Sequence, residues 1–524
     1  MSSMQRSLQL IETLQRPEVW PGGVKTVQLI ETHISWVLLT GKSAFKIRKP
    51  VDLGFLDFST LARRDHCAHE EIRLNRRFAP EIYQDVLRIT GSAEAPAFGG
   101  EGPLIEVAVR MRQFDPSREL DEELVAGRLN AADMVAVAEE VAGFQLRAPR
   151  SEAADPYGTP AAVLAPVREN FVQLRSVGAD LPALEPALDE LEAISEHWAE
   201  SLAPLFVERR AAGFIREGHG DLHLANLTRL PEGIRAFDCI EFSAALRWID
   251  VVSDVAFLFM DLSRKRRTDL AWTLLNAWLV RSGDYRGVAL LRFYVVYRAL
   301  VRAKVAALRR DQLRGKDRDR CEQELFDYLD LARTTATQKP PRLILTCGVS
   351  GSGKSWLGSR LAAAEGWVHI RSDVERKRLF GLRAEQPSGS EHDAGIYAPG
   401  VSELTYRHLL DLTAEMLEAD QSVLVDATFL SRSQRKPFIE LAQRRHVAMQ
   451  ALYVTCAQAT LRERVRQRQA EGRDASEADE SVLAEQLRRI EMPTSDEGVA
   501  VIEVDSGNEP DLQELAARMD RPGN

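Results

Sequence analysis

The chain has 524 residues, which is enough for two or three domains of ordinary size, and its 45% apolar and 28% charged residues are usual for a globular protein. The formal net charge of −10 disfavours a dedicated binder of nucleic acid or of anionic membranes, and no apolar run reaches the length of a membrane span. The five cysteines form no C-x-x-C pair, so we expect reduced thiols, no structural zinc and a cytoplasmic location.

Residues 20–112 read as a small lobe of strands and one helix. Its strand-like apolar runs are separated by turn residues and lie at 27–30, 33–40, 43–48, 86–89 and 105–111. We expect the residues between 91 and 102 to form a hairpin loop. The run from Ser43 to Arg48 alternates small or charged residues with apolar ones, which predicts a half-buried strand with Lys46 and Arg48 on one face. A charged helical pattern follows at 61–77.

Helical patterns dominate residues 113–332, which we interpret as a second, larger lobe. They lie at 119–126, 131–147 and 182–210, with one or two long helices at 292–332. The polar, proline-ended stretch 333–341 is predicted to be a linker. The domains are therefore expected at 1–332 and 342–524.

A polar segment in the larger lobe has the spacing of a kinase catalytic loop. His219, Asp221 and Asn226 fit H-x-D-x-x-x-x-N, and Asp238 follows twelve residues after Asn226. In such a loop one aspartate accepts the proton of the attacking hydroxyl, while the asparagine and the later aspartate hold Mg²⁺. Phosphoryl transfer depends on positioning and charge neutralisation, so these groups suffice. A polar loop without a catalytic role, or an inactive kinase, are the alternatives.

With Gly220 and His223 in place, this loop reads H-G-D-L-H-x-x-N and resembles the aminoglycoside phosphotransferase and choline kinase-like family. The resemblance implies an α+β bilobal protein-kinase-like fold for the N-terminal domain. It also implies that Asp221 is the catalytic base. The metal ligands implied by it are Asn226 and Asp238.

The same resemblance gives a role to Lys46, which would pair with the nucleotide phosphates. The lysine would be held by Glu70 or Glu71 on the following helix, and the sequence does not choose between the two glutamates. No G-x-G-x-x-G precedes Lys46 and no A-P-E-type segment follows Asp238. Both departures from protein kinases favour a small-molecule kinase.

The C-terminal part begins with a phosphate-binding motif. A buried strand is predicted at 343–347 and a helix begins near 356; between them the pattern G-x-x-x-x-G-K-S is formed by Gly348, Val349, Ser350, Gly351, Ser352, Gly353, Lys354 and Ser355. In this arrangement backbone N–H groups and the helix N-terminus surround phosphates. Lys354 would reach the β- and γ-phosphates of ATP, and the Ser355 hydroxyl would hold Mg²⁺.

Further strands separated by helical patterns follow the motif, at 367–370, 422–428, 452–454 and 499–504. This alternation predicts an α/β P-loop NTPase domain with a parallel sheet and ligands at the carboxyl ends of its strands. Asp373 and Asp426 both fall at that edge. Either carboxylate could bind Mg²⁺ or accept a proton from a hydroxyl substrate, and Asp426 is our candidate metal ligand. Helix N-caps are the alternative for both residues.

Arg464 and Arg468 lie four residues apart on a predicted helix after the fourth strand. Together with Asp373 and Asp426 they resemble the P-loop kinases of the polynucleotide-kinase, gluconate-kinase and zeta-toxin type. By that resemblance Asp373 acts on the substrate hydroxyl and the two arginines form a lid over the transferring phosphoryl group. A solvated helix face and a nucleic-acid-binding patch are the alternatives, although no aromatic residues interleave with the arginines.

The order of the two halves resembles an aminoglycoside-phosphotransferase-like domain fused to a P-loop, AAA-type ATP-binding domain. We therefore expect an ATP- and Mg²⁺-dependent phosphotransferase with two separate nucleotide sites that acts on hydroxyls of small molecules, without nucleic acid or membrane as a partner. One alternative is a single catalytic kinase domain regulated by a non-catalytic nucleotide-binding domain. Another is a nucleic-acid end kinase, which the negative net charge disfavours. The acceptor of either domain and the oligomeric state are left open.

Overall fold

The computed structural model describes residues 3–52, 54, 56–337, 339–390, 395–472 and 474–520. These pack into two compact units. The first contains Met1–Leu129, Gly143–Glu169 and Glu196–Leu258; the second contains Asn130–Ala142, Asn170–Ser195 and Phe259–Asn524. The second unit thus joins helices N-terminal to residue 333 with the C-terminal part. The expected domains at 1–332 and 342–524 and the linker at 333–341 stay predictions, and Gln338 of that linker lies outside the described residues.

The N-terminal lobe is a six-stranded antiparallel sheet with the strand order β1-β2-β3-β6-β4-β5. Its strands are β1 (Gln28–Glu31), β2 (Ser35–Leu39), β3 (Ser43–Arg48), β4 (Tyr83–Gly91), β5 (Pro96–Phe98) and β6 (Leu104–Arg112). The expected hairpin loop at 91–102 is wrong in part, because β5 lies within it and pairs with β4. Pro96, Ala97 and Phe98 form too short a run to stand out as a strand in the sequence.

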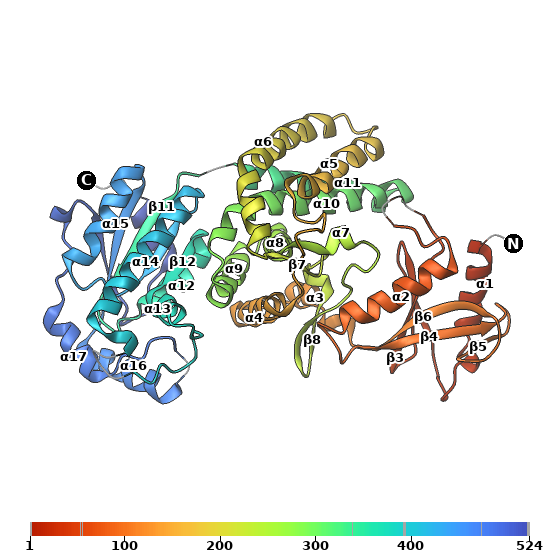
Figure 1. Cartoon of the computed structure of the whole chain (residues 1–524), viewed down its shortest axis with the longest axis horizontal. Coiled ribbons are helices and arrows are strands. Elements are labelled where there is room, and N and C mark those ends of the chain that lie inside the picture. Colours follow the sequence, from red (N-terminus) through yellow and green to blue (C-terminus); the bar gives the residue numbers. More distant parts are fainter. Residues whose placement is uncertain are drawn as a thin grey trace. The chain divides into compact units, whose positions relative to one another are not determined.

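The two faces of this sheet are covered by different helices (Figure 1). On one face α1 (Ser3–Leu14) packs with Trp36, Leu38 and Phe45 in a common apolar cluster. On the other face α2 (Leu61–Asn75) packs through Ala68 against residues of β4 and β6. Helix α2 begins where predicted, because the Thr60 side chain accepts a hydrogen bond from the backbone N–H of Arg63. Helix α2 thereby places Glu70 and Glu71 beside the sheet.

The rest of the first unit contains two short antiparallel ladders that frame the catalytic-loop motif. Strand β7 (Ile215–Glu217) pairs with β10 (Trp248–Asp250), and β8 (Leu227–Leu230) forms a hairpin with β9 (Gly233–Ala236). The residues of the motif lie between β7 and β8. Short helices of this unit are α3 (Leu120–Val125) and α7 (Ala244–Arg247), and longer helices that contribute residues to both units are α4 (Ala131–Arg147), α5 (Pro160–Val177), α6 (Leu184–Ala211) and α8 (Val251–Arg264).

In the second unit, the predicted long helical stretch at 292–332 is two helices, α10 (Leu291–Gln312) and α11 (Lys316–Ala336), which pack along each other. They are separated at Gly315, whose φ of 59° lies in the region that favours glycine. Helix α9 (Thr268–Ser282) precedes them and packs against α12 (Lys354–Glu365).

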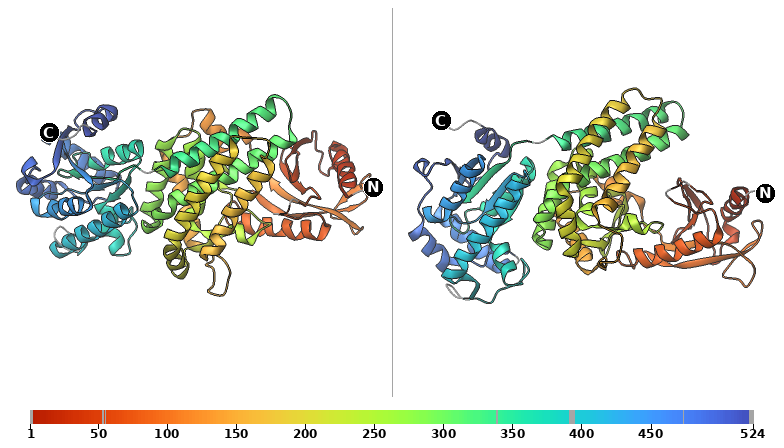
Figure 2. Two further views of the ribbon diagram at one scale, coloured as in Figure 1. Left: turned by 90° about the horizontal axis from the view of Figure 1, so that it is seen from above. Right: turned by 45° about the horizontal axis from the view of Figure 1, so that its top comes forward.

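The C-terminal part of the second unit is a five-stranded parallel sheet with the strand order β12-β13-β11-β14-β15, which confirms the predicted fold class. Its strands are β11 (Arg342–Cys347), β12 (Val368–Arg371), β13 (Val423–Asp426), β14 (Ala448–Thr455) and β15 (Ala500–Asp505). Helices lie on both faces (Figure 2); besides α12 they are α13 (Ser372–Leu379), α14 (Pro399–Glu418), α15 (Arg432–Arg445), α16 (Gln458–Glu471), α17 (Glu480–Arg489) and α18 (Leu512–Met519). Across the described residues, no helix combines the length and the apolar character that crossing a membrane requires.

Candidate active sites

Lys46 lies between two carboxylates that are far from it in the sequence. Its Nζ is 3.0 Å from Oε1 of Glu71 and 2.5 Å from Oδ1 of Asp238. Burial alone would lower the pKa of Lys46, but the carboxylates of Asp238, Glu71 and Glu241 outweigh burial and raise it. The lysine therefore stays charged, with its ammonium group held between the small lobe and the segment that carries Asp238.

Glu71, not Glu70, is the partner of Lys46. The Glu71 side chain is fully buried and also accepts a hydrogen bond from Arg48, which in turn donates to Glu241 at 2.7 Å. Glu70 instead pairs with Arg73, one turn along the outer side of α2. The strand alternation predicted for β3 is confirmed, because Lys46 and Arg48 reach the same glutamate.

Asp254 holds the backbone of the catalytic-loop motif. Its two oxygens accept hydrogen bonds from the N–H groups of His219, at 2.8 Å, and Gly220, at 2.9 Å. Gly220 has a φ of 87°, and a Cβ added there would lie 2.7 Å from the carbonyl oxygen of Leu246, so only glycine fits. Burial lowers the pKa of His219 despite the nearby Asp254, and the neutral ring bridges the backbone N–H of Asp221 and the carbonyl of Phe237. His219 thus fixes loop geometry.

The acidic and amide groups predicted for chemistry converge beside Lys46. The Asn226 Nδ2 donates to the backbone oxygen of Asp221 at 2.9 Å and to its Oδ2 at 3.3 Å. Asp238 has a φ of 62°, and its N–H donates to the hydroxyl of Tyr83 at 3.0 Å. Burial opposes ionisation of Asp238, but Lys46 lowers its pKa, and its side chain remains 45% exposed. Asp238, from the segment after β9, thus presents a carboxylate to solvent near Asp221.

The donor chemistry of this site fits Mg²⁺ held jointly with a nucleotide. Oδ1 of Asp238 faces Lys46, which leaves its second oxygen for a cation, and the amide oxygen of Asn226 is the other available hard donor. Among the described residues there is no group of three or more His, Cys, Asp or Glu side chains that could form an all-protein metal site. Mg²⁺ is usually bound through one or two protein oxygens together with substrate phosphates, so one oxygen each from Asp238 and Asn226 would be enough protein ligands.

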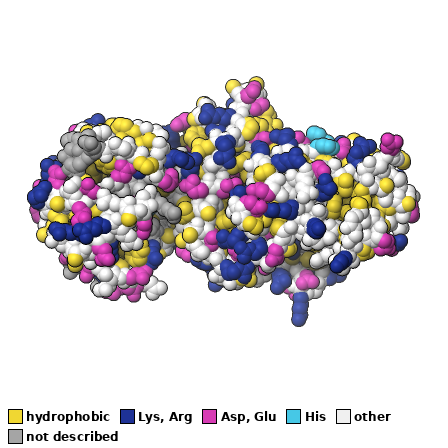
Figure 3. All heavy atoms as spheres, turned by 90° about the horizontal axis from the view of Figure 1, so that it is seen from below, with side chains coloured by type: hydrophobic (Ala, Val, Ile, Leu, Met, Phe, Trp, Pro, Cys, Tyr) yellow, Lys and Arg dark blue, Asp and Glu magenta, His cyan; other side chains and the backbone are white. Residues whose placement is uncertain are grey.

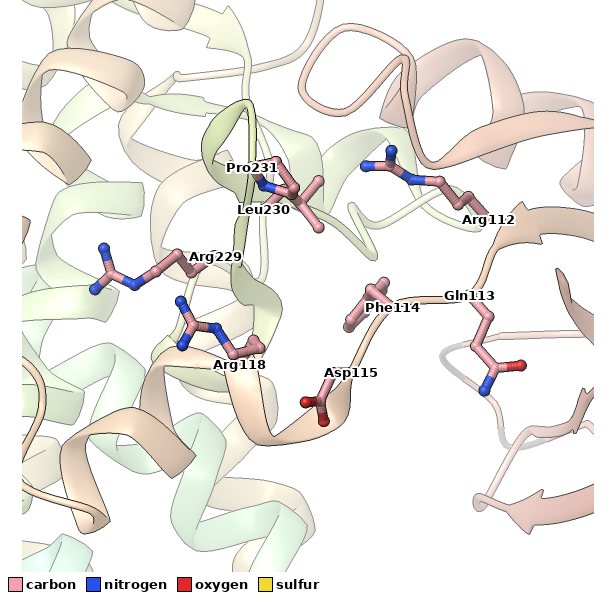
Figure 4. A pocket seen from close by; sticks show the side chains of 8 residues that line it. All are labelled: Arg112, Gln113, Phe114, Asp115, Arg118, Arg229, Leu230 and Pro231. Carbon is pink, nitrogen blue, oxygen red and sulfur yellow. The ribbon is translucent and has the colours of Figure 1, made fainter. Parts of the chain in front are cut away.

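A pocket of about 440 Å³ also opens in the first unit, beside the segment that leaves β6. Figure 4 shows Arg118 and Arg229 on one side of it and Arg112 on the other. These arginines already have counter-charges, because Arg118 and Arg229 pair with the buried Glu123 and Arg112 pairs with Glu232. The lining does not include Lys46, Asp221 or Asp238. We assign the pocket no part in the chemistry.

The phosphate-binding loop of the second unit has the backbone that its glycines predict. Gly348, Gly351 and Gly353 have φ values of 141°, 82° and 84°, and a Cβ on Gly348 or Gly351 would collide with the backbone oxygen of Val454 or Leu461. Helix α12 begins directly after the loop, at Lys354, so the positive end of its dipole faces the loop. Ser355 follows in the first turn of the same helix.

Lys354 folds onto its own loop. Its Nζ donates to the backbone oxygen of Val349 at 2.7 Å and to the Ser352 hydroxyl at 3.4 Å. Burial lowers the pKa of Lys354, although the charges of Asp426 and Asp373 oppose that shift. Both predicted acids are therefore close enough to act on this lysine, at the edge of the sheet where the prediction placed them.

Asp426 lies at the end of β13, next to the loop. Its Oδ1 accepts a hydrogen bond from Thr346 at 3.1 Å, and its Oδ2 is 3.6 Å from Nε2 of His369. Burial opposes ionisation, but His369, Arg371 and Lys354 together hold the pKa of Asp426 well below its ordinary value. The helix-cap alternative is wrong for Asp426, because the N-cap residue of the next helix, α15, is Ser431. A buried, ionised carboxylate is suited to a cation held by Ser355.

Asp373 lies in the first turn of α13, whose N-cap residue is Arg371, so Asp373 is not a cap either. Arg468 donates to the backbone oxygen of Ala478 at 2.7 Å, and its charge acts on Lys354. Arg464 donates to the Ser506 hydroxyl at 3.0 Å and to the Ser506 backbone oxygen at 2.7 Å. Both arginines are thus bonded near the loop and do not form a solvated face, and their role as a lid stays a prediction.

Several residues of these sites were missed in the sequence. Gln486 of α17 accepts a hydrogen bond from the N–H of Ser350 in the phosphate loop at 2.7 Å, and the Ser506 hydroxyl donates to the Ser352 backbone oxygen at 2.7 Å. Gln486 and Ser506 lie more than a hundred residues after the loop in the sequence, and no motif spacing links them to it.

The fold and these sites define the class of the protein: a kinase-like pair of lobes with a lysine–glutamate pair, followed by a P-loop domain. The family model for an AAA domain matches residues 343–493. The uncharacterized protein Rv2004c of Mycobacterium tuberculosis is 32% identical over 424 residues, which cover 81% of this chain and 82% of that protein, and Mb2027c of Mycobacterium bovis matches to the same extent. This chain belongs to the family of these mycobacterial proteins.

Solved structures of two kinds resemble parts of the chain. Choline kinase from Cryptosporidium parvum is 13% identical and covers 63% of this chain and 96% of its own, with a TM-score of 0.41. A gluconokinase from Sinorhizobium meliloti is 24% identical and covers 35% of this chain and 91% of its own, with a TM-score of 0.24. At these TM-scores the two likenesses carry no weight in the functional argument below.

Proposed function

We propose that the protein is an ATP- and Mg²⁺-dependent kinase with two separate nucleotide sites, one in each unit, that phosphorylates hydroxyl groups of small molecules. The observation that carries the proposal is the convergence of Lys46, Glu71, Asp221, Asn226 and Asp238 from distant parts of the chain in a unit that lacks the P-loop. Two unrelated arrangements for holding phosphates in one chain support two sites.

In the first site Lys46 would hold the nucleotide phosphates, with Glu71 fixing its direction. Asp221 would accept the proton of the acceptor hydroxyl as the oxygen attacks the terminal phosphorus. Asn226 and Asp238 would hold Mg²⁺, which neutralises charge on the transferring phosphoryl group when bound. The hydrogen bond from Asn226 to Asp221 keeps the base and the metal donors in one geometry.

In the second site the N–H groups of residues 348–355 would surround the phosphates, and Lys354 would leave Val349 to bind them. Ser355 and Asp426 would hold Mg²⁺. Asp373 would accept the proton of the second acceptor, and Arg464 and Arg468 would approach the phosphoryl group. For Arg464 this requires the bonds to Ser506 to open.

The charge of the molecule supports a small acceptor over nucleic acid. The net charge is −10, and on the face shown in Figure 3 basic and acidic side chains are interspersed. The five free cysteines, four of them buried, support a reducing compartment, for which we propose the cytoplasm.

The test is phosphoryl transfer by the full chain from γ-³²P-labelled ATP to a library of hydroxyl metabolites, with the Asp221→Asn and Lys354→Ala variants run in parallel. We expect two sets of labelled products, one lost in each variant. If Lys354→Ala loses no product, the C-terminal part is a non-catalytic nucleotide-binding domain. If Asp221→Asn retains all products, the first site is not a kinase site.

A further inference from the structure

Helix α9, which precedes the P-loop part by some sixty residues, is bonded to the edge of its sheet. The strand order makes β12 an edge strand, paired only with β13 among the described strands. On the other side of β12, Asn276 of α9 donates from Nδ2 to the backbone oxygen of Trp367 at 3.0 Å and accepts from the N–H of His369 at 2.9 Å. One side-chain amide thus makes the pair of hydrogen bonds that a neighbouring strand residue would make.

The contact between Asn276 and His369 is linked through the His369 side chain to Asp426, a proposed metal ligand. The backbone of His369 is bonded to Asn276, while the ring of His369 faces Asp426 with Nε2 at 3.6 Å from Oδ2. The same ring nitrogen would lie 3.0 Å from a Cβ on Gly358 of α12. A displacement of β12 at Asn276 would therefore change the position of the His369 ring relative to Asp426.

A second set of bonds holds α13, the helix that carries Asp373. Glu375 is fully buried and accepts hydrogen bonds from the Tyr285 hydroxyl at 2.9 Å and from Nε of Arg378 at 3.0 Å. His408 of α14 lies 3.4 Å from the same carboxylate. Burial opposes ionisation of Glu375, but these three donors lower its pKa, so the bond from Tyr285 is a charge-assisted one.

Arg378 connects this cluster to the end of α9. Its Nη2 donates to the backbone oxygens of Leu279, at 3.1 Å, and Val280, at 2.7 Å, in the last turn of that helix. A cation at a helix C-terminus binds carbonyls that have no partner within the helix and interacts favourably with the dipole. Helix α13 is thus tied at two residues, Glu375 and Arg378, to one segment from α9 to Tyr285.

We propose that Asn276 and Tyr285 are positioning residues of the C-terminal phosphoryl-transfer site. They set the strand–helix pair β12–α13 against the phosphate loop, and with it Asp373 and the His369 ring that faces Asp426 on β13. The inference rests on the proposed function of that site. In this inference the segment from α9 to Tyr285, outside the P-loop motif, holds Asp373 and the His369 ring in position. The loop itself is fixed by β11, at the centre of the sheet. Asn276 acts through His369, and Tyr285 acts through Glu375, two residues after Asp373.

The test measures ATP hydrolysis, with MgATP as the probe and water as the acceptor, in the full chain carrying Asp221→Asn to silence the first site. Asn276→Ala and Tyr285→Phe are compared with this parent, and Thr273→Ala is the matched control. Thr273 lies on α9, and within the part of the chain that the structure describes its side chain donates to the backbone oxygen of Asp269 in its own helix. Each protein is also followed by thermal unfolding, so that rates are expressed per folded molecule.

We expect kcat to fall about tenfold or more in both variants, because small misplacements of catalytic groups are costly, while KM for ATP stays within about twofold. The control should match the parent. Tyr285→Phe removes one oxygen only, so it remains informative if Asn276→Ala does not fold. Combining Tyr285→Phe with Glu375→Gln should lower kcat by less than the product of the two single effects.

The inference is overturned if kcat per folded molecule stays within about twofold of the parent in the variants that fold, since the bonds would then only stabilise packing. It is also overturned if KM rises and kcat does not change. A parent whose hydrolysis is not reduced by Lys354→Ala contradicts the proposed function of the second site itself, and the inference falls with it. That result differs from one in which the parent shows Lys354-dependent turnover and the Asn276 and Tyr285 variants keep it. The second result overturns the inference alone.

Discussion

The two candidate sites hold positive charge for phosphates in opposite ways. In the first unit, Lys46 is paired with Glu71 and Asp238, and Arg48 is paired with Glu71 and Glu241. In the second unit, Lys354 bonds a carbonyl and a hydroxyl of its own loop. The groups that would hold phosphates come from side chains of distant segments in the first site and mainly from the backbone of eight consecutive residues in the second.

The difference shows in the pKa values of the two lysines. Burial would lower both, yet carboxylates raise the pKa of Lys46, whereas the pKa of Lys354 is lowered because Asp426 and Asp373 only partly offset burial. The first site therefore contains its own counter-charges and is stabilised by them. In the second site, no described carboxylate is bonded to the lysine, and we expect a bound polyanion to supply the missing negative charge.

The largest effect expected is on turnover at the first site. Asp221→Asn should lower phosphoryl transfer there by about 10²–10⁴-fold, which is the range for loss of a general base, and leave Lys354-dependent turnover unchanged. The measurement is the initial rate with the acceptor found in the library screen. Asp85→Asn, which alters an exposed pair with Arg110 in the same unit, is the control and should have no effect. A Asp221→Asn enzyme with wild-type rates would contradict the role of the loop.

The adjacent glutamates of α2 test whether the first site is stabilised by its counter-charges. Glu71→Gln leaves Lys46 and Arg48 short of a buried carboxylate and should cost about 3–5 kcal/mol in the free energy of unfolding. Glu70→Gln is the matched control and should cost about 1 kcal/mol or less, because its pair with Arg73 is partly exposed. Denaturant unfolding of the two variants distinguishes them, and equal losses would contradict the account.

For the lysine of the second site, substitution should change stability little and nucleotide affinity strongly. Lys354→Ala removes a buried ammonium group to which no carboxylate of the described residues is bonded, so the free energy of unfolding should change by less than in Glu71→Gln. The affinity for MgATP should fall about tenfold or more, measured by titration with a fluorescent ATP analogue in the Asp221→Asn background. A large loss of stability with unchanged affinity would show that the loop lysine is structural.

The smallest expected effect is on the pH dependence of stability. It concerns the carboxyl group of Glu119, which lies near other carboxyl groups. Burial, together with Asp121 and Glu122, raises its pKa from 4.5 to about 7. Between these values the folded state binds more protons than the unfolded state, so this group lowers stability as pH rises from 4.5 to about 7. Glu119→Gln should therefore raise the unfolding temperature at pH 8 more than at pH 5.

The control for this prediction is Glu94→Gln, at an exposed position of the same unit. It should shift the unfolding temperature by a similar small amount at both pH values. If Glu119→Gln instead has the same effect at pH 5 and pH 8, Glu119 does not titrate in this range in the folded protein.

How far the sequence predicts each site follows from how each is built. The phosphate loop is one contiguous segment. Its backbone requires glycine at positions such as Gly348 and Gly351, so the motif and the structure agree there. The five parallel strands were also predicted, since each is a short apolar run between helical patterns. The strand order was not, because local patterns do not specify which strands become neighbours.

For the first site, the sequence left open which glutamate pairs with Lys46. Adjacent glutamates at 70 and 71 have the same local pattern, and only the direction in which α2 faces the sheet selects Glu71. Gln486, Ser506 and Asn276 were missed for a related reason. Each acts on a segment distant in the sequence, through one or two hydrogen bonds that leave no periodicity or spacing to detect.

The central claim, that one chain contains two independent nucleotide sites, is tested most directly by binding stoichiometry. Isothermal titration with a non-hydrolysable ATP analogue and Mg²⁺ would be run on the full chain, on Lys46→Ala, on Lys354→Ala and on the double variant. We expect two nucleotides per wild-type chain, one for each single variant and none for the double variant. A single nucleotide bound by the wild type, lost entirely in one of the two single variants, would contradict the claim.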